Sequence, residues 1–341
     1  MSSQRTRIGV VGAGRASKQI NLPNLRANPE VELAAVCNAR PETASQVASE
    51  FGIAEVVDHW TSMVARDDLD AIWIGTPPIM HAPVTIAALK HGKHVFCQAR
   101  MAMDLAGARA MLAAARQHPE LVTMLSPPPS GMKAGRLLQR LLAEGYVGEL
   151  YHFRLVADND MFASPSAPAH WRQRREVTGL NVMSVGIHAE VLQRWLGSPS
   201  RLHAQTSVAV PVRDGYAVQV PDVVQVTGEW GDGVIGALEW SGVALFAPEA
   251  TLTLHGSDGT LEYNFTTEQV RGARRGDSEL QVFELPADLE SSWTVEHDFI
   301  AAVRTGGHPE PSFETGVGYM EFTEAVHLSA LTGREVQFPL P

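Results

Sequence analysis

A pair of glycines close to the amino terminus has the spacing needed to bind a phosphate group. Residues 7–17 read Arg-Ile-Gly-Val-Val-Gly-Ala-Gly-Arg-Ala-Ser, so a β-branched apolar run enters the glycines and a helical pattern follows. The first glycine makes the tight bend, the second lets backbone N–H groups approach phosphate, and the helix N-terminus favours negative charge. Ser17 fills the third small position, so we favour a dinucleotide-binding turn over an ordinary strand-to-helix turn. The predicted cofactor contacts in it are Gly12, Ala13, Gly14, Arg15 and Ala16.

The end of the second apolar run bears on the choice of dinucleotide. An acidic residue about twenty positions past the glycines is the usual partner of the NAD 2′-hydroxyl. Asn38 stands at that point, and an amide accepts less well than a carboxylate. Arg40 or Arg15 could instead pair with a 2′-phosphate. The sequence therefore favours NADP over NAD as a cofactor, against the alternative that Asn38 only supports a turn and Arg40 is solvated.

Another strand-like run ends in Gly-Thr-Pro-Pro at 75–78, and His81 follows shortly after. Strand ends on this edge of a doubly wound sheet face the ligand crevice. Thr76 and Pro77 are therefore predicted to line the cofactor, and His81 is either a further contact or a helix cap.

A second group of chemistry-bearing residues lies in an apolar helical pattern over residues 180–196. Residues spaced ~100° apart place Asn181, Ser184 and His188 between apolar stripes. Polar side chains in a buried sector cost about 1–3 kcal/mol each unless they are hydrogen-bonded, so such a set either satisfies itself internally or lines a pocket. We favour the pocket, with Asn181 and Ser184 as substrate contacts. The same geometry puts Glu190 on the solvated face of the helix.

Two further groups follow a predicted strand and a polar loop. Residues 158–160 are Asp-Asn-Asp, and Trp171 and Arg172 come after the loop. Either group could contact a substrate. The alternatives are that the acidic residues are solvated and that Trp171 belongs to the core. We predict that Trp171 and Arg172 contact the substrate.

The elements that must position these residues change character once along the chain. The first third alternates apolar runs with helical patterns, which is typical of βαβ units around a parallel sheet. Predicted strands are 8–11, 33–37, 71–75, 94–97 and 122–125, and predicted helices are 16–27, 41–51, 82–91 and 105–117. The proline cluster at 126–130 breaks this pattern. We therefore expect one domain of residues 1–126 and a second of residues 127–341.

The second part of the chain reads as a helix at 133–144, a strand at 151–157 and successive strands over 202–285 with Gly-Asp turns. Such meanders form an antiparallel sheet. Helices at 294–305 and 316–331 and a short final strand close the chain. The expected fold class is α/β, with an N-terminal Rossmann doubly wound parallel sheet and a C-terminal α+β domain that carries an open, mostly antiparallel sheet.

The bulk composition argues against several classes of function. A length of 341 residues suits two domains, and a formal charge of −11 argues against nucleic-acid and anionic-membrane surfaces. No apolar stretch approaches the ~20 residues of a membrane span, and because residues 1–6 are polar we expect no signal peptide. Cys37 and Cys97 form no metal pattern, so we expect no metal and two reduced core thiols in a cytoplasmic protein.

Taken together, these segments resemble the Gfo/Idh/MocA family of NAD(P)-dependent oxidoreductases. The matching residues are Gly12-Ala13-Gly14-Arg15, Thr76-Pro77-Pro78-Ile79-Met80-His81, Gly92-Lys93-His94-Val95, Trp171-Arg172, Gly186-Ile187-His188, Trp195-Leu196-Gly197 and the region from Ala325 to Val336. The resemblance implies an N-terminal Rossmann domain and a C-terminal domain whose open sheet makes a homodimer or homotetramer. It also implies a sugar, polyol or cyclitol substrate that is oxidised or reduced at a carbon facing the nicotinamide.

Two departures from the family pattern bear on the chemistry. The family usually has Glu-Lys-Pro, with a lysine that binds substrate and assists proton transfer, where this chain has Gln98-Ala99-Arg100. The family usually places an aspartate four residues before the histidine, and this chain has Ser184 at that position. His188 is then the remaining acid/base candidate, and an ordinary pKa near ~6.5 suits proton transfer in either direction. Arg100 is predicted to anchor substrate or cofactor, since guanidinium is a poor base, and Gln98 is placed with the cofactor contacts.

Three functions remain open at this point. The first is an NADP- or NAD-dependent oxidoreductase with a modified site in which His188 and Arg100 are catalytic. The second is a redox-neutral lyase, epimerase or glycoside-cleaving enzyme that uses transient oxidation by bound NAD(P). The third is a non-catalytic ligand sensor. Fold alone does not decide among them, but the polar stripe around His188 argues against the sensor, and we favour the first.

Overall fold

The computed structural model describes residues 5–15, 17–128 and 132–341, which divide into two compact units. The first unit holds the chain up to Pro127 together with Thr294–Met320. The second holds Pro128–Trp293 together with Glu321–Pro341. The predicted domains of residues 1–126 and 127–341 stay a prediction, and these compact units place Pro127 and Thr294–Met320 with the first part of the chain.

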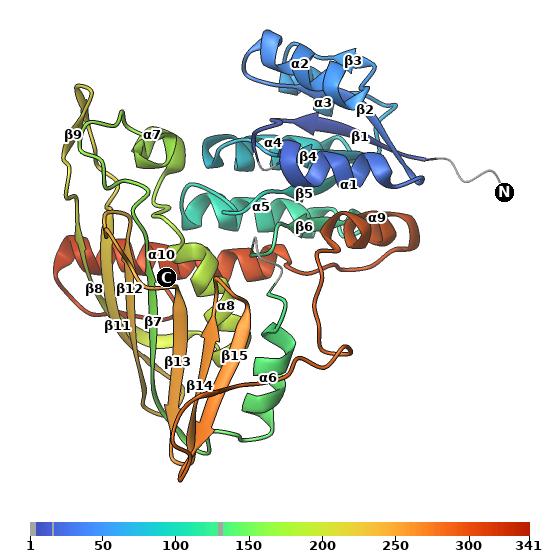
Figure 1. Cartoon of the computed structure of the whole chain (residues 1–341). Helices are drawn as coiled ribbons and strands as arrows, with labels where there is room; N and C mark the ends of the chain where they lie inside the picture. Colours follow the sequence, from blue (N-terminus) through green and yellow to red (C-terminus); the bar gives the residue numbers. More distant parts are fainter. Residues whose placement is uncertain (1–4, 16, 129–131) are drawn as a thin grey trace. The chain divides into compact units, whose positions relative to one another are not determined.

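A parallel sheet of six strands forms the centre of the first unit, in the order β3-β2-β1-β4-β5-β6 (Figure 1). Its strands are β1 (Thr6–Val11), β2 (Val31–Cys37), β3 (Glu55–Val56), β4 (Ala71–Ile74), β5 (His94–Cys97) and β6 (Thr123–Leu125). Helical segments connect them: η1 (Ser17–Asn21), α1 (Leu22–Ala27), α2 (Pro41–Phe51), α3 (Trp60–Val64), η2 (Pro78–Met80), α4 (His81–Lys90) and α5 (Leu105–Gln117). This order is that of a doubly wound dinucleotide-binding sheet, so the predicted Rossmann sheet is confirmed.

The order of this sheet reverses between β1 and β4, and two glycine turns meet at that point. Gly12 follows β1 with a φ of 83°, and Gly75 follows β4. A Cβ atom on Gly75 would lie 2.2 Å from the carbonyl oxygen of Gly12 and 2.3 Å from Ser17 Oγ, so only glycine fits there. Ligands of such sheets bind beside the carboxyl ends of the strands at the point of reversal.

The segment that returns to the first unit completes the core there. Within α9 (Val295–Thr305), the Phe299 ring meets Trp73 edge-on at 5.9 Å between ring centroids. Trp73 itself stacks on Phe96 at 3.6 Å, which joins β4 to β5. Aromatic pairs of this kind add to the free energy gained by burying their area. This cluster explains why α9 belongs with the parallel sheet. The start of α10 (Phe313–Thr332) is held by Tyr319, whose hydroxyl accepts the N–H of Met101 at 2.6 Å.

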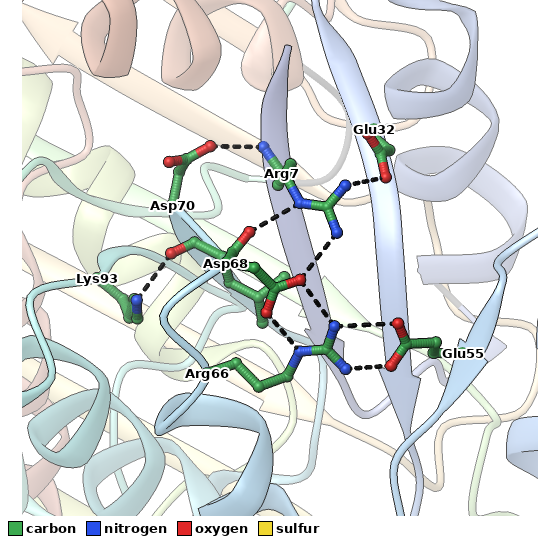
Figure 2. A network of polar contacts seen from close by, with 8 residues as sticks. Arg7, Glu32, Glu55, Arg66, Asp68, Asp70 and Lys93 are labelled. Carbon is green, nitrogen blue, oxygen red and sulfur yellow. Dashed lines mark hydrogen bonds and ion pairs between the residues drawn. The ribbon is translucent and has the colours of Figure 1, made fainter. Parts of the chain in front are cut away.

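An ion-pair network ties the starts of β1 and β2 to the chain that precedes β4. The Arg7 guanidinium lies between Glu32 and Asp68, and the Arg66 guanidinium lies between Asp68 and Glu55, as Figure 2 shows. Hydrogen bonds from Arg66 and Arg7 hold the pKa of the Asp68 carboxyl well below its usual range. Asp68 is therefore the residue that joins the two guanidinium groups.

A mixed sheet of nine strands forms the second unit, in the order β16-β15-β14-β13-β7-β12-β11-β8-β17. Its strands are β7 (Leu150–Asp158), β8 (Pro199–Ser207), β11 (Val223–Trp230), β12 (Val234–Ser241), β13 (Thr251–Gly256), β14 (Gly259–Asn264), β15 (Gln269–Arg274), β16 (Gln281–Val282) and β17 (Val336–Gln337). A separate hairpin pairs β9 (Val212–Arg213) with β10 (Tyr216–Ala217). Neighbours run antiparallel except β12 and β7, so the mostly antiparallel sheet is confirmed.

This sheet has one apolar face and one polar face. Along β7, Phe153 and Leu155 are buried, whereas His152 and Arg154, which alternate with them, are exposed. Alternation of this kind puts the apolar residues on the core face and leaves the other face solvated. The helical segments of this unit are α6 (Gly135–Ala143), η3 (Trp171–Gln173), α7 (Arg175–Thr178), α8 (Val185–Leu196) and the later part of α10.

The helix predicted over residues 180–196 begins only at Val185. Gly179 and Met183 have φ angles of 67° and 40°, and such left-handed backbone is incompatible with an α-helix. Asn181 therefore lies before the helix rather than on its face. Ser184 is the N-cap residue, and His188 lies one turn inside the helix.

The expectation that Glu190 is solvated was wrong. Its side chain is 5% exposed and forms an ion pair with Arg194, one turn further along α8. A buried carboxylate needs such a partner, because an unpaired charge away from water is costly.

None of the helices in the described part of the chain combines the length and the apolar character that a bilayer crossing requires. The described residues also contain no group of three or more His, Cys, Asp or Glu side chains that could hold a metal ion.

We expect Asp68→Asn to destabilise the first unit, because the substitution removes the anion shared by Arg7 and Arg66. Asp68 is 46% exposed, so solvent screening limits the loss to about 1 kcal/mol, or about 3 °C in Tm. The pKa of Asp68 is lowered on folding, so its contribution is present above about pH 4 and is lost as pH falls below that value. Thermal unfolding at pH 7 and pH 3 measures this.

The neighbouring exposed Asp67→Asn is the matched control, and its Tm should stay unchanged at both pH values. Equal Tm values for the two variants at pH 7 would contradict a stabilising role for the network.

Candidate active site

The glycine turn after β1 has the geometry that a pyrophosphate needs. The N–H of Gly12 donates to Cys37 O at 2.8 Å and that of Ala13 donates to Asn38 Oδ1 at 2.7 Å. Among the described residues no acceptor is recorded for the N–H of Gly14, and a Cβ there would meet only Gly75 O, at 3.6 Å. The turn therefore has an N–H group and open space beside a helical segment, which is the arrangement that binds phosphate oxygens.

Asn38 holds this turn in place. Its Oδ1 accepts the N–H of Ala13, and its Nδ2 donates to Thr43 Oγ1 at 3.2 Å. With both ends of the amide engaged in the fold, the geometry favours the alternative that Asn38 supports the turn. Its role as a ribose contact stays a prediction.

The two arginines predicted near the 2′ end of the dinucleotide are both exposed. Arg15 follows the glycine turn and donates to Gln19 Oε1 at 3.2 Å. Arg40 follows β2 as the residue before α2. Ala16, also predicted as a contact, lies outside the described residues.

The carboxyl end of β4 presents a polar atom that lacks a partner. Thr76 Oγ1 is buried, and it has no hydrogen-bond partner among the described residues. An orphaned hydroxyl beside a phosphate-binding turn fits a ligand group that completes its hydrogen bonding. Pro77 follows as an exposed residue, and both stay predicted cofactor contacts.

His81 braces two strand ends from inside the protein. Its Nε2 lies 2.7 Å from Thr76 O and its Nδ1 lies 2.9 Å from Arg100 O, and the ring is 0% exposed. Burial lowers the pKa of His81, and the two carbonyl groups oppose that shift. The geometry favours a structural role over direct cofactor contact, because the His81 ring connects the segment after β4 with the segment after β5.

The segment that replaces Glu-Lys-Pro is also built into the fold. Gln98 Nε2 donates to Asn21 Oδ1 at 2.6 Å, and Asn21 Nδ2 donates to Glu296 Oε1 at 2.6 Å. Arg100 is 5% exposed. Gln98 thus supports η1 through Asn21, and its contact with a cofactor and the catalytic role of Arg100 stay predictions.

A cavity of about 380 Å³ lies in the second unit, where β7 ends and α8 begins. Its polar lining residues are Asp158, Asn159, Ser184, His188, Glu249 and Thr266. Its larger apolar lining residues are Met132, Ile187, Val191 and Phe265. Apolar walls with a few polar groups are typical of small-molecule sites, and this volume suits a ligand of monosaccharide size. Of the predicted stripe, Ser184 and His188 line the cavity.

Trp240 fixes the protonation state of His188. The Trp240 Nε1–H group donates to His188 Nδ1 at 2.8 Å, and both side chains are buried, with 0% and 7% exposed. The indole is a donor only, so Nδ1 must carry the lone pair and Nε2 must carry the proton. Burial lowers the pKa of His188 to about 4, below the ordinary histidine value near ~6.5. His188 is a neutral donor at pH 7.

The other predicted substrate contacts do not line this cavity. Asn181 is 1% exposed, and its Nδ2 donates to Thr178 O at 2.7 Å. Arg172 lies over the Trp171 ring at 4.3 Å from its centroid, and burial lowers the pKa of this guanidinium. Trp171 and Arg172 thus form a stacked pair in η3. The contact of Asn181, Trp171 and Arg172 with a substrate stays a prediction.

Sequence reasoning missed two side chains that shape this cavity or its histidine. Trp240 and Glu249 lie far from α8 in sequence, and no local pattern connects them with it. Asp158, which the sequence offers as a possible substrate contact, lines the cavity. Its Oδ1 is buried without a partner among the described residues. Burial and the Glu239 charge raise the pKa of Asp158.

Known proteins resemble the chain over nearly its full length. Levoglucosan dehydrogenase of Pseudarthrobacter phenanthrenivorans is 26% identical, with 89% of each chain covered. A dTDP-3,4-didehydro-2,6-dideoxy-alpha-D-glucose 3-reductase of Streptomyces antibioticus is 29% identical over 90% of this chain and 91% of its own. A solved structure of levoglucosan dehydrogenase in complex with NADH has the same fold, with a TM-score of 0.86, 24% identity and coverage of 98% of this chain and 100% of that one.

Both parts of the chain match one protein family. Residues 6–126 match its NAD-binding Rossmann domain, described as an oxidoreductase family, and residues 136–262 match the Gfo/Idh/MocA C-terminal domain. The glycine turn and the NAD-binding sheet lie in the first match, and His188 and Trp240 lie in the second. The chain therefore belongs to the Gfo/Idh/MocA family of NAD(P)-dependent oxidoreductases.

Proposed function

We propose that the protein transfers a hydride between a nicotinamide dinucleotide and a hydroxyl or carbonyl carbon of a sugar-, polyol- or cyclitol-like small molecule. The supporting observation is the pairing of a phosphate-binding turn in one unit with a polar, sugar-sized cavity around His188 in the other. The relatives named above act on sugars, which favours the same substrate class here.

When bound, NAD(P) supplies the hydride donor or acceptor for this chemistry. Gly12, Ala13 and Gly14 would hold its pyrophosphate, because the turn offers an N–H group and space. Thr76 would add a hydroxyl at the end of β4. Arg40 and Arg15 would pair with a 2′-phosphate, so the proposal keeps NADP as the preferred cofactor.

His188 would donate its Nε2–H to the oxygen on the reacting carbon. A neutral imidazole can polarise a carbonyl in this way, and a donor aimed at developing negative charge stabilises the transition state. Because Nε2 carries the proton and Nδ1 is occupied by Trp240, His188 cannot also accept the hydroxyl proton. We therefore assign proton transfer to the Asp158 carboxyl, which lines the same cavity and has a raised pKa.

The polar face of the nine-stranded sheet would be the contact between copies in a homodimer or homotetramer. It carries a hollow of about 450 Å³ lined by Arg154, His203, Gln225, Thr227 and Glu239, among others. Such a sheet face is suited to an isologous contact. Cys37 and Cys97 are both free and buried, which agrees with a cytoplasmic location.

Incubating the protein with NADP or NAD and a panel of sugars, polyols and ketones tests the function. We expect a change in reduced-nicotinamide absorbance with at least one sugar, and about a hundredfold lower kcat for His188→Ala. His308→Ala, at an exposed histidine that lines neither the cavity nor the proposed contact between copies, is the control and should keep its activity. Product without net cofactor change would point to a redox-neutral reaction. Failure of calorimetry to detect any nucleotide binding would contradict the proposal.

Arg40→Ala should raise KM for NADP about fivefold and leave KM for NAD unchanged, because the lost contact involves only the 2′-phosphate. Initial rates with each cofactor measure this. Arg26→Ala, another exposed arginine of the first unit, should change neither value. A parallel change in both KM values would argue that Arg40 does not distinguish the cofactors.

Trp240→Phe should lower kcat about fivefold, because the loss of one hydrogen bond leaves the tautomer of His188 unfixed. Nitrogen-15 NMR of the ring should show Nδ1 losing its hydrogen bond and the pKa of His188 rising above about 4. Trp230→Phe removes another buried tryptophan of the same sheet and is the matched control. An unchanged His188 signal in Trp240→Phe would disprove the assigned tautomer.

A further inference from the structure

The charged groups of the His188 cavity define the class of substrate. We propose that this cavity selects uncharged polyhydroxylated molecules and discriminates against sugars that carry a phosphate or carboxylate, with Glu249 as the selecting residue. This inference rests on the proposed function, since it concerns the same site. Such selection would distinguish between the two kinds of compound for which the relatives are named, levoglucosan and a dTDP-linked sugar.

Glu249 is held in the cavity wall by a fixed amide. Asn264, at the end of β14, donates its Nδ2 to Glu249 Oε2 at 2.6 Å. Its Oδ1 accepts the N–H groups of Thr266 and Thr267, both at 2.9 Å. Because two backbone donors occupy the oxygen, the amide cannot turn over, and its NH₂ group must face the carboxylate. The position of the Glu249 charge is therefore set by the fold.

The charged side chains that line the cavity in the described part of the chain are acidic. Among the described residues that line the cavity, none is lysine or arginine, whereas two are carboxylates, Asp158 and Glu249. His188 adds no positive charge at pH 7, because burial lowers its pKa to about 4. An anionic ligand would thus meet repulsion from both carboxylates. One unit charge several ångströms away, in a partly buried site, changes affinity by about tenfold.

The same groups suit a neutral sugar. A free carboxylate oxygen accepts hydrogen bonds from hydroxyl groups, and Ser184, Thr266 and His188 add further polar contacts. Phe265 and Ile187 supply apolar wall for the C–H faces of a ring. A molecule rich in hydroxyl groups satisfies both kinds of wall without bringing a charge.

Ligand-observed NMR titrations on the NADP-loaded protein test this with sugars that differ in charge. The probes are D-glucose, levoglucosan and D-xylose against D-glucose 6-phosphate and D-glucuronate. We expect the neutral sugars to bind at least about tenfold more tightly than the anions. Glu249→Lys should reduce that ratio to within about threefold, and Glu249→Gln should give an intermediate ratio in case the lysine variant does not fold.

Glu284→Lys makes the same charge change at an exposed position that does not line the cavity, and it should keep the wild-type ratio. Equal or tighter binding of the anions, no binding of any neutral probe, or the same ratio in the Glu249 and Glu284 variants would each overturn the inference. A neutral sugar that binds without any change in the cofactor would count against the proposed function and leave the charge selection standing.

Discussion

The close approach of Gly12 and Gly75 is the constraint on which the first unit depends. The N–H of Gly75 donates to Val11 O at 2.9 Å, and the N–H of Gly12 donates to Cys37 O at 2.8 Å. These bonds extend the parallel ladder beyond the strands, so the ends of β2, β1 and β4 stay together. A side chain at Gly75 would separate them, since its Cβ would lie 2.2 Å from a carbonyl oxygen. The phosphate-binding turn, Thr76 and the His81 brace all depend on that contact.

In the second unit the comparable constraint is the hydrogen bond from Trp240 to His188. The indole nitrogen of Trp240 can only donate a hydrogen bond. Because Trp240 is 0% exposed, this N–H cannot donate to bulk water and donates to His188 instead. The proton of the neutral imidazole is therefore on Nε2. Under the proposed function, Nε2–H would polarise the substrate oxygen and a carboxyl group would transfer the proton. That division of roles depends on the single donor that Trp240 supplies from β12.

The sequence was informative where local rules decide the structure. Strands with continuous apolar runs, helical periodicity and the glycine turn all depend on near neighbours, so the parallel sheet and the meander sheet could be predicted. Prediction failed where distant contacts decide. The left-handed Met183 delays the start of α8 to Val185, Glu190 is buried beside Arg194, and Phe299 completes an aromatic cluster with strands some 200 residues away. Trp240 reaches His188 across 52 residues, a separation that no periodicity encodes.

The two departures from the family pattern bear on the charge state of His188. The resemblance implies a lysine and an aspartate where this chain has Ala99 and Ser184, and both of these residues are uncharged. An aspartate at position 184, four residues before His188, would raise the pKa of the imidazole. Burial lowers that pKa, and the hydrogen bond from Trp240 also favours the neutral ring. Because Ser184 is uncharged, it does not oppose the neutral state of His188.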